Sequence, residues 1–335
     1  MNSIKRVQKA IEEIKNGNII IMVDDEDREN EGDLVYASVF STPDKVNFLA
    51  KEARGLICVA LTKDIAENLD LQPMVKSNTS SYETAFTISV DAKDCETGIS
   101  AYERDLTIKL LSSPTTKSDD LVRPGHIFPL IAKDGGTLVR TGHTEGSVDI
   151  CKLAGLYPSA VICEVMKDDG TMARRDDLDE FAKKYNLHTV YISDIVEYRL
   201  QFESLITKLN EEDIEMSGVK FKKYTFQDHQ DKIHYALVNE AKNTTNVKFY
   251  PLEDNIKFIE KLEEFNKIVD YIKYNSGAII FMDSETNDKQ KEFGIGAQIL
   301  KQLGISKLHL ISKSDKNEFF GLKGFGIEII DTIKV

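Results

Sequence analysis

A run of ten residues that follows a buried strand constrains this chain more than any other feature. The run DDEDRENEGD, residues 24–33, holds seven carboxylates and one arginine, and it directly follows the apolar segment IIIMV, residues 19–23. An apolar segment of this length, bounded by Gly17, predicts a buried strand. Carboxylates crowded at the end of such a strand repel one another.

Two interpretations of this acidic run compete. A charge run is usually a solvated surface turn. Gly32 and Arg28 favour a specified geometry, because glycine permits backbone conformations closed to other residues and arginine offers a planar fork of donors. A divalent cation would supply the missing positive charge, and Mg²⁺ typically binds one or two protein carboxylates with water and substrate oxygens. The run therefore predicts a metal site whose other ligands lie elsewhere in the chain.

Length and charge limit the class of protein. The chain has 335 residues, enough for about two domains of roughly 150 residues each. Its net charge of -13 argues against a nucleic-acid partner, because phosphate backbones are bound by basic faces. No run approaches the ~20 apolar residues that cross a membrane, and residues 1–17 predict a helix capped by Ser3 instead of a signal peptide. We therefore expect a cytoplasmic protein that acts on small molecules, with no membrane partner.

The four cysteines, Cys58, Cys95, Cys151 and Cys163, are widely spaced and form no C-x-x-C pair. This spacing predicts neither a zinc site nor a disulfide framework. Cys58 and Cys163 lie in apolar, strand-like runs, so we expect them to be buried thiols.

Helix-period and strand-period segments alternate through about residue 200. The predicted helices cover residues 4–16, 43–53, 102–111, 144–154 and 177–185. The predicted strands cover residues 19–23, 56–61, 85–90, 127–132 and 159–165, and a last strand leads into a helix over 189–206. This order predicts a mixed sheet with helices. Because the sequence becomes polar after that, we place a domain boundary near 205–215, which gives domains of residues 1–205 and 210–335.

The motif RTGHTEGSVDI, residues 140–150, predicts an anion site. Arg140 offers a planar fork for a phosphate, Gly142 frees the backbone, and Thr144 would cap a helix whose first amides point at the same space. His143 stands at the turn and would complete a metal site with Glu29. The alternative is an ordinary capped helix after a polar turn.

Two further motifs hold candidates for acid–base chemistry. RPGHIFPL, residues 123–130, fixes His126 before an apolar strand, either as a proton carrier or as a hydrogen-bonded loop histidine. VICEVM, residues 161–166, places Glu164 inside an apolar strand, where an unpaired charge is costly. Burial of that kind raises the pKa of a carboxyl group toward the range of a general acid or base.

In this order the motifs resemble the family of 3,4-dihydroxy-2-butanone 4-phosphate synthase, from riboflavin biosynthesis. The matching segments are DDEDRENEGD, GLICVAL, TAFTISVDA, TGISAYERDLTI, RPGHIFPL, RTGHTEGSVDICKLAG and ICEVMKDDGTMAR. The resemblance implies a carbon–carbon lyase that converts D-ribulose 5-phosphate to L-3,4-dihydroxy-2-butanone 4-phosphate and formate. It also implies Mg²⁺, no organic cofactor, and a homodimer with the site close to the interface. We expect an α+β chain whose N-terminal domain is a three-layer α/β/α arrangement around a mixed sheet.

The resemblance also implies the site residues, position by position. Glu29 and His143 match the metal ligands of the family. We expect Mn²⁺ to substitute for Mg²⁺, because histidine is a less typical ligand for magnesium than oxygen. The positions that match substrate contacts, with the loop from 140 to 144 nearest the phosphate, are Arg28, Glu29, Asp33, Arg140, Thr141, Gly142, His143, Thr144 and Glu164.

Proton transfer is less completely assigned. His126 and Glu164 match residues that the family requires for turnover, and Glu31 is a third candidate. A divalent ion on the sugar oxygens would stabilise the enediolate that forms when a proton is removed next to the ketone. The sequence leaves open which of Glu31, Asp33, His126 and Glu164 makes each proton transfer.

The end of the chain, residues 292–331, resembles the last part of GTP cyclohydrolase II. That family binds zinc through three cysteines, and no cysteine follows Cys163, so we expect no zinc here. SGAIIFMDSETN, residues 276–287, and LISKSDKNE, residues 310–318, stand where the family carries arginine-bearing motifs. We expect residues 210–335 to form a smaller, degenerate and catalytically silent α/β domain. The alternatives are a bifunctional enzyme that is also a GTP cyclohydrolase II, and a non-catalytic regulator that binds phosphosugars.

Overall fold

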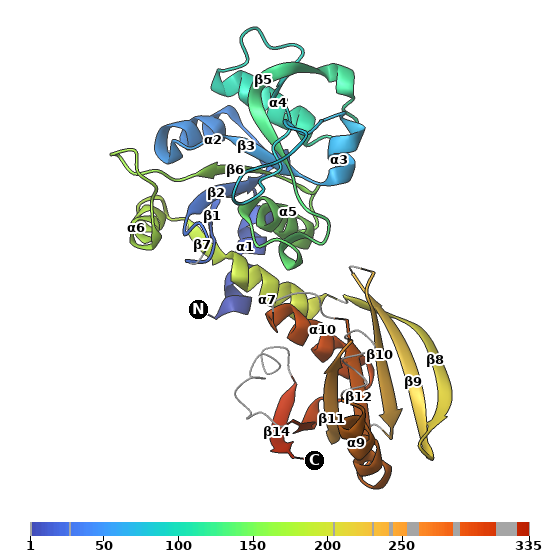
Figure 1. Ribbon diagram of the computed structural model, residues 1–335. Helices are drawn as coiled ribbons and strands as arrows, with labels where there is room; N and C mark the ends of the chain where they lie inside the picture. The colour runs from blue at the N-terminus through green and yellow to red at the C-terminus, as the bar shows by residue number, and fades with distance from the viewer. Residues whose placement is uncertain are drawn as a thin grey trace. The chain divides into compact units, whose positions relative to one another are not determined.

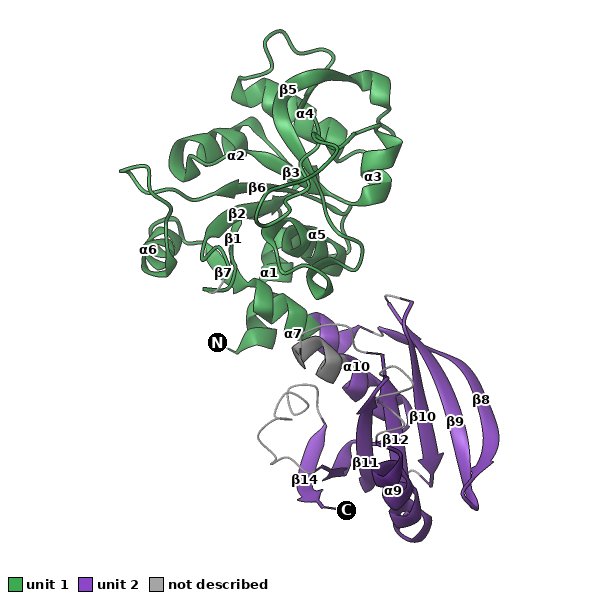
Figure 2. Cartoon of the chain, viewed as in Figure 1, with its two compact units in different colours: residues 1–198 green, residues 199–335 purple. Residues whose placement is uncertain are grey.

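The computed structural model describes residues 2–26, 28–203, 205–229, 231–240, 244–252, 261–283, 289–312 and 327–334. The chain divides into two compact units, residues 1–198 and 199–335 (Figure 2). Parts of the segments 276–287 and 310–318 lie outside the described residues.

A seven-stranded sheet forms the centre of the first unit (Figure 1), with strands in the order β4-β5-β3-β6-β2-β1-β7. The strands are β1 (Ile20–Val23), β2 (Gly32–Ala37), β3 (Cys58–Leu61), β4 (Val90–Ala92), β5 (Leu121–Ile131), β6 (Ser159–Glu164) and β7 (His188–Tyr191). β1 pairs antiparallel with β2 and parallel with β7. The predicted mixed sheet is therefore confirmed.

Helices cover both faces of this sheet. α2 (Pro43–Phe48), α3 (Lys63–Asn68), α4 (Ala101–Leu111) and α6 (Arg175–Tyr185) share a core with Ile21 and Leu34. α1 (Ser3–Lys15), α5 (His143–Leu153) and α7 (Ile192–Phe202) share another core with Ile20 and Val35. Successive strand residues point to opposite faces, so Ile20 and Ile21 enter different cores. The expected three-layer α/β/α arrangement is confirmed, and Cys58 and Cys163 are buried free thiols as predicted.

Several predicted elements differ from the structure. The predicted strand 127–132 is only the apolar second half of β5, and the predicted strand 85–90 reduces to isolated bridges before the short β4. The predicted helix 43–53 is α2 followed by a π-helical turn, Leu49–Ala53. Asn2, not Ser3, caps α1 by accepting the N–H of Lys5. Thr144 does not cap α5, which begins at His143 after Gly142 and has no side-chain cap.

The second unit also contains a seven-stranded sheet, in the order β14-β13-β11-β12-β10-β9-β8. Its strands are β8 (Ile206–Met216), β9 (Val219–Asp228), β10 (Ile233–Asn239), β11 (Thr244–Pro251), β12 (Gly277–Met282), β13 (Lys307–Ile311) and β14 (Glu328–Ile333). α9 (Leu262–Asn275) packs Phe265, Ile268 and Ile272 into the core of this unit, and α10 (Lys289–Gln302) is its other helix among the described residues. The predicted smaller α/β part is thus confirmed.

The polar segment in which we placed the domain boundary is strand β8. It pairs with β9 at the edge of the second sheet, and most of its side chains are exposed. Because an exposed edge strand lacks a buried apolar row, its sequence reads as a polar connection. The division between the compact units falls earlier, after Tyr198.

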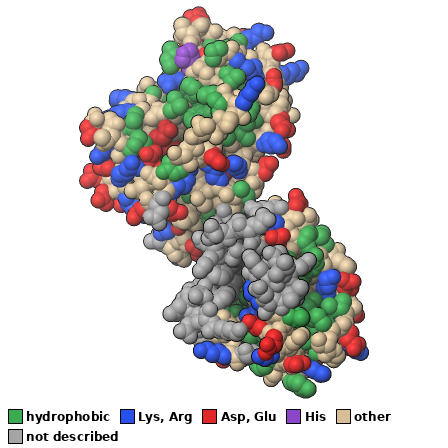
Figure 3. Space-filling view, viewed as in Figure 1, with side chains coloured by type: hydrophobic (Ala, Val, Ile, Leu, Met, Phe, Trp, Pro, Cys, Tyr) green, Lys and Arg blue, Asp and Glu red, His purple; other side chains and the backbone are tan. Residues whose placement is uncertain are grey.

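Charged side chains of both signs are interspersed on the face of the first unit shown in Figure 3, with apolar side chains exposed between them. Within the described part of the chain, no helix combines the length and apolar character needed to cross a membrane.

Candidate active site

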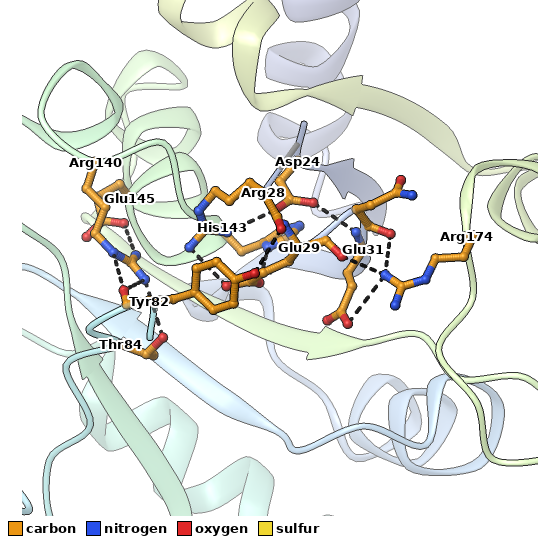
Figure 4. A network of polar contacts seen from close by, with 11 residues as sticks. Asp24, Arg28, Glu29, Glu31, Tyr82, Thr84, Arg140, His143, Glu145 and Arg174 are labelled. Carbon is orange, nitrogen blue, oxygen red and sulfur yellow. Dashed lines mark hydrogen bonds and ion pairs between the residues drawn. The ribbon is translucent and has the colours of Figure 1, made fainter. Parts of the chain in front are cut away.

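The acidic loop, residues 24–31, connects the antiparallel strands β1 and β2, and Asp24 organises it (Figure 4). The buried Asp24 carboxylate accepts the backbone N–H groups of Glu29 at 3.0 Å and Glu31 at 2.8 Å. It also accepts Nη1 of Arg28 at 2.9 Å. These three bonds stabilise a carboxylate that burial alone would penalise. Sequence analysis gave Asp24 no role, and its place directly after the strand was the available signal.

The structure brings the two predicted metal ligands together. Oε2 of Glu29 lies 3.9 Å from Nδ1 of His143, while Oε1 of Glu29 pairs with Arg28 at 3.0 Å. Ligand atoms of Asp24, Glu29 and His143 all lie within 4.8 Å of one another. Both Asp24 oxygens already accept hydrogen bonds from the loop. Oε1 of Glu29 is also paired, with Arg28, but its Oε2 faces His143, so Glu29 and His143 stay the candidate metal ligands of this cluster.

The donor chemistry of this pair fits a divalent cation. His143 is buried, and its Nε2 has no hydrogen-bond partner within the described part of the chain. Burial lowers the pKa of His143 below its ordinary value, although Asp24 and Glu29 oppose the shift. The imidazole is thus held in the neutral form, which is the form that coordinates metals. One oxygen and one nitrogen donor suit Mg²⁺ or Mn²⁺ once water and substrate oxygens are added.

The loop predicted to bind phosphate has two parts with different surroundings. Arg140 pairs with the buried Glu145 and donates from Nη2 to the carbonyl oxygen of Tyr82 at 2.9 Å. A Cβ at Gly142 would lie 2.2 Å from Nη1 of Arg140, so glycine lets this guanidinium pass close to the backbone. Thr144 is buried in the first turn of α5. In this structure Arg140 therefore braces the loop.

Thr141, in contrast, faces an open pocket of about 560 Å³. The residues that line this pocket are Asp25, Glu26, Arg28, Tyr82, Thr141 and Arg175. The guanidinium of Arg28 stacks on the Tyr82 ring, with 5.1 Å to the ring centroid. Arg28 and Arg175 give the pocket two cations for a phosphate. In this structure both are already paired with carboxylates, Arg28 with Asp24 and Glu29, and Arg175 with Glu26 at 3.7 Å.

Asp33 and Glu164 face one another across strands β2 and β6, where they are register partners. Asp33 is buried and its Oδ1 has no hydrogen-bond partner among the described residues. Glu164 accepts the N–H of Leu56 at 2.8 Å. Burial raises the pKa of Asp33 well above its ordinary value, and the neighbouring charge of Glu164 raises it further; burial also raises the pKa of Glu164. Each of these carboxyl groups therefore favours its protonated form more than an exposed carboxyl group does.

Glu31 and Arg174 meet at the far end of the acidic loop. Burial raises the pKa of Glu31, and the charge of Arg174, 3.5 Å away, opposes the shift. Nη1 of Arg174 also donates to the carbonyl oxygens of Glu29 and Asn30, each at 2.6 Å. Arg174 ends the segment ICEVMKDDGTMAR, in which no local pattern gives it a function. The connection of Arg174 to the acidic loop is visible only in the tertiary structure, in its hydrogen bonds to Glu29 and Asn30.

His126 lies on β5 and is paired with Asp91. Asp91 accepts the backbone N–H of His126 at 2.8 Å, and its second oxygen lies 2.7 Å from Nδ1 of the ring. A carboxylate on Nδ1 orients an imidazole for proton transfer at Nε2. Within the described ranges, no hydrogen bond or ion pair joins His126 to the acidic loop. Sequence analysis missed Asp91, because nothing in TAFTISVDA indicates which strand it faces.

Comparisons with known proteins show which families the two parts of the chain match. The family model described as 3,4-dihydroxy-2-butanone 4-phosphate synthase matches residues 8–198, and the model described as GTP cyclohydrolase II matches residues 251–334. A Helicobacter pylori protein named 3,4-dihydroxy-2-butanone 4-phosphate synthase is 53% identical, and the match covers 99% of each chain.

Two solved structures are similar to this chain. RibBX of A. baumannii, described as a two domain 3,4-dihydroxy-2-butanone 4-phosphate synthase, is 35% identical with a TM-score of 0.82, covering 98% of this chain and 99% of that one. A 3,4-dihydroxy-2-butanone 4-phosphate synthase in complex with two magnesium ions is 37% identical with a TM-score of 0.57, covering 59% of this chain and 97% of that one. Both units thus have matches among known proteins, and the chain belongs to the 3,4-dihydroxy-2-butanone 4-phosphate synthase family.

Proposed function

We propose that this chain converts D-ribulose 5-phosphate to L-3,4-dihydroxy-2-butanone 4-phosphate and formate in riboflavin biosynthesis, with Glu29 and His143 holding the catalytic metal. The observation that carries the assignment of the site is the approach of Glu29 to the buried, neutral His143. The magnesium-bound relative supports a divalent ion of this kind. We expect Mn²⁺ to support activity as well.

The remaining side chains divide the chemistry among them. A bound divalent ion would stabilise negative charge on the sugar oxygens. Asp33 and Glu164 are register partners whose pKa values are both raised, so one of them can accept a proton from a substrate carbon while the other donates one to a leaving hydroxyl. Glu31, at the end of the loop, and His126, oriented by Asp91, are the other acid–base candidates. The pocket lined by Thr141 and Arg28 is the proposed place of the phosphate.

We propose a homodimer with its interface on the side of α4. Ile99 is 54% exposed and Tyr102 is 76% exposed, which is unusual for large apolar side chains so close together. They follow Gly98, whose backbone packs against the Asp91–His126 pair. A second copy that covers them would put the interface close to His126.

The second unit is proposed to be catalytically silent, in a cytoplasmic enzyme without nucleic-acid or membrane partners. Its part of the sequence has no cysteine, so the three thiolates of the cyclohydrolase zinc site are absent. RibBX, a two domain relative, also carries the synthase name. These two observations support a second unit that holds no zinc.

The test is formate release from ribulose 5-phosphate by the full chain with added Mg²⁺, with Glu29→Ala measured beside it and GTP offered as a parallel substrate. We expect formate from the sugar phosphate only, and a loss of at least about 100-fold in Glu29→Ala, in the range typical for a lost metal ligand or its support. Full activity after removal of all divalent ions would contradict the metal assignment. Formate from GTP would mean that the second unit is a working cyclohydrolase, and no formate from either substrate would favour the phosphosugar-binding regulator.

A further inference from the structure

We propose that Arg174 is a positioning residue for the metal ligand Glu29, and this inference rests on the proposed role of Glu29. Arg174 precedes α6 and reaches the acidic loop from the side opposite His143 (Figure 4). Its Nη1 donates to the carbonyl oxygens of Glu29 and Asn30, each at 2.6 Å, and lies 3.5 Å from Glu31. One guanidinium nitrogen therefore contacts three consecutive residues of the loop.

Glu29 is held through both polar groups of its own backbone. Its N–H donates to the Asp24 carboxylate at 3.0 Å, and its C=O accepts from Arg174 at 2.6 Å. The residue that follows, Asn30, has a left-handed φ of 54°, a conformation that surrounding contacts must maintain. With the backbone fixed at these points, the direction of the Glu29 Cα–Cβ bond is fixed. The carboxylate is thereby kept beside His143 before an ion arrives.

Charge and geometry predict opposite effects when Arg174 is removed. A cation next to the site repels a divalent ion, so the loss of its charge alone would strengthen metal binding. Because the Arg174 side chain is 46% exposed, solvent screens most of that repulsion. Loss of the two carbonyl bonds instead frees the ligand-bearing loop and weakens metal binding. A stronger affinity for the ion in Arg174→Ala would therefore indicate charge repulsion, and a weaker affinity would indicate a positioning role.

A role in helix capping is separable from this role. The backbone N–H of Arg174 donates to Asp177 at 2.9 Å at the start of α6. That bond survives replacement of the side chain by alanine. Arg54 provides a matched control. Its side chain is 38% exposed and pairs with Asp168 at 2.6 Å. Within the described residues no hydrogen bond or ion pair joins Arg54 to the acidic loop.

The experiment is a titration of the full chain with Mn²⁺, followed by electron paramagnetic resonance of the free ion. For Arg174→Ala we expect the Mn²⁺ Kd to rise by about 10- to 100-fold, the range typical for groups that orient metal ligands. Arg174→Lys keeps a positively charged donor but lacks the planar fork of arginine. Its Mn²⁺ Kd should therefore lie between that of the unaltered chain and that of Arg174→Ala. Arg54→Ala should bind Mn²⁺ as the unaltered chain does. At saturating Mn²⁺, Arg174→Ala should regain most of the kcat for formate release that it loses at limiting Mn²⁺.

An unchanged or lower Kd in Arg174→Ala would overturn the positioning role, and so would an equal rise in Arg54→Ala. Glu29→Gln separates this failure from failure of the proposed function. If Glu29→Gln loses Mn²⁺ binding but Arg174→Ala does not, only the role of Arg174 is wrong. If Glu29→Gln keeps full affinity, the metal site itself is misassigned. Thermal melting of each metal-free variant verifies that it folds. If Arg174→Ala does not fold, the Mn²⁺ Kd of Arg174→Lys is compared with that of the unaltered chain instead.

Discussion

At the scale of single residues, two buried aspartates of one loop region have opposite surroundings. Asp24 is satisfied by Arg28 and two backbone N–H groups. Asp33 is equally buried but has an oxygen without a partner in the described part of the chain, opposite Glu164. Such an unfavourable arrangement costs stability and is typical of sites where a shifted pKa serves chemistry.

We predict that Asp33→Asn stabilises the protein at pH 8 and has little effect at pH 4. The folded pKa of Asp33 is raised above its unfolded value, so stability falls as the pH rises from the unfolded pKa through the folded pKa. Asparagine does not ionise and escapes this cost. Thermal melting in chelator should show a higher Tm for Asp33→Asn at pH 8, by roughly 2–4 °C for each kcal/mol. An equal difference at both pH values would contradict the prediction, and formate release should be lost throughout.

At the scale of elements, the turn before α4 shapes the His126 site. Gly98 has a φ of +83°, and a Cβ there would lie 2.0 Å from Oδ2 of Asp91 and 2.7 Å from Nδ1 of His126. We predict that Gly98→Ala lowers kcat for formate release by at least about tenfold, because the clash displaces a pair placed for acid–base catalysis.

Gly155→Ala is the control for this change. Gly155 has a similar φ of +71° but nothing within 4 Å of the added carbon. In both variants the left-handed alanine destabilises the folded state by about 1–2 kcal/mol, so the Tm of both should be lower than that of the unaltered chain. Only Gly98→Ala should lose turnover. Equal kcat in the two variants would show that the Asp91–His126 pair is unimportant for the reaction.

Several elements with a buried apolar row could be predicted from the sequence, but exposed strands could not. The fully buried β2 was also missed, because it begins inside the acidic run. β1 is apolar throughout, and β6 is apolar between Ser159 and Glu164, so their runs identified them. β5 begins with alternating exposed residues, and β8 is exposed along most of its length, so both were shortened or missed. The site followed the same rule. Charge crowding pointed to Glu29, but the roles of Asp91 and Arg174 arise from contacts between distant segments that no local pattern encodes.

At the scale of the whole molecule, the proposed chemistry is confined to the first unit. The described part of the second unit has its own apolar core around α9. Nδ1 of its buried His234 accepts the backbone N–H of Asp283 at 3.2 Å, so Nε2 carries the proton and donates to the Asp228 carboxylate at 3.1 Å. Both ring nitrogens are thus used in internal hydrogen bonds. Because the proposed function places no zinc in this unit, we expect the apolar core to stabilise its fold.

Assembly is the property of the whole molecule that a single substitution can test. We predict that the full chain sediments at twice its 37.8 kDa, and that Tyr102→Glu sediments at 37.8 kDa with reduced formate release. A carboxylate in the first turn of α4 favours the helix dipole, so the helix itself should not suffer, while its burial in an apolar interface is costly. Tyr274→Glu is the matched control, because Tyr274 is 81% exposed on α9 of the second unit and is not one of the residues of the proposed interface. A monomeric full chain, or a Tyr102→Glu variant that still dimerises, would refute the interface, whereas dissociation by Tyr274→Glu would move it to the second unit.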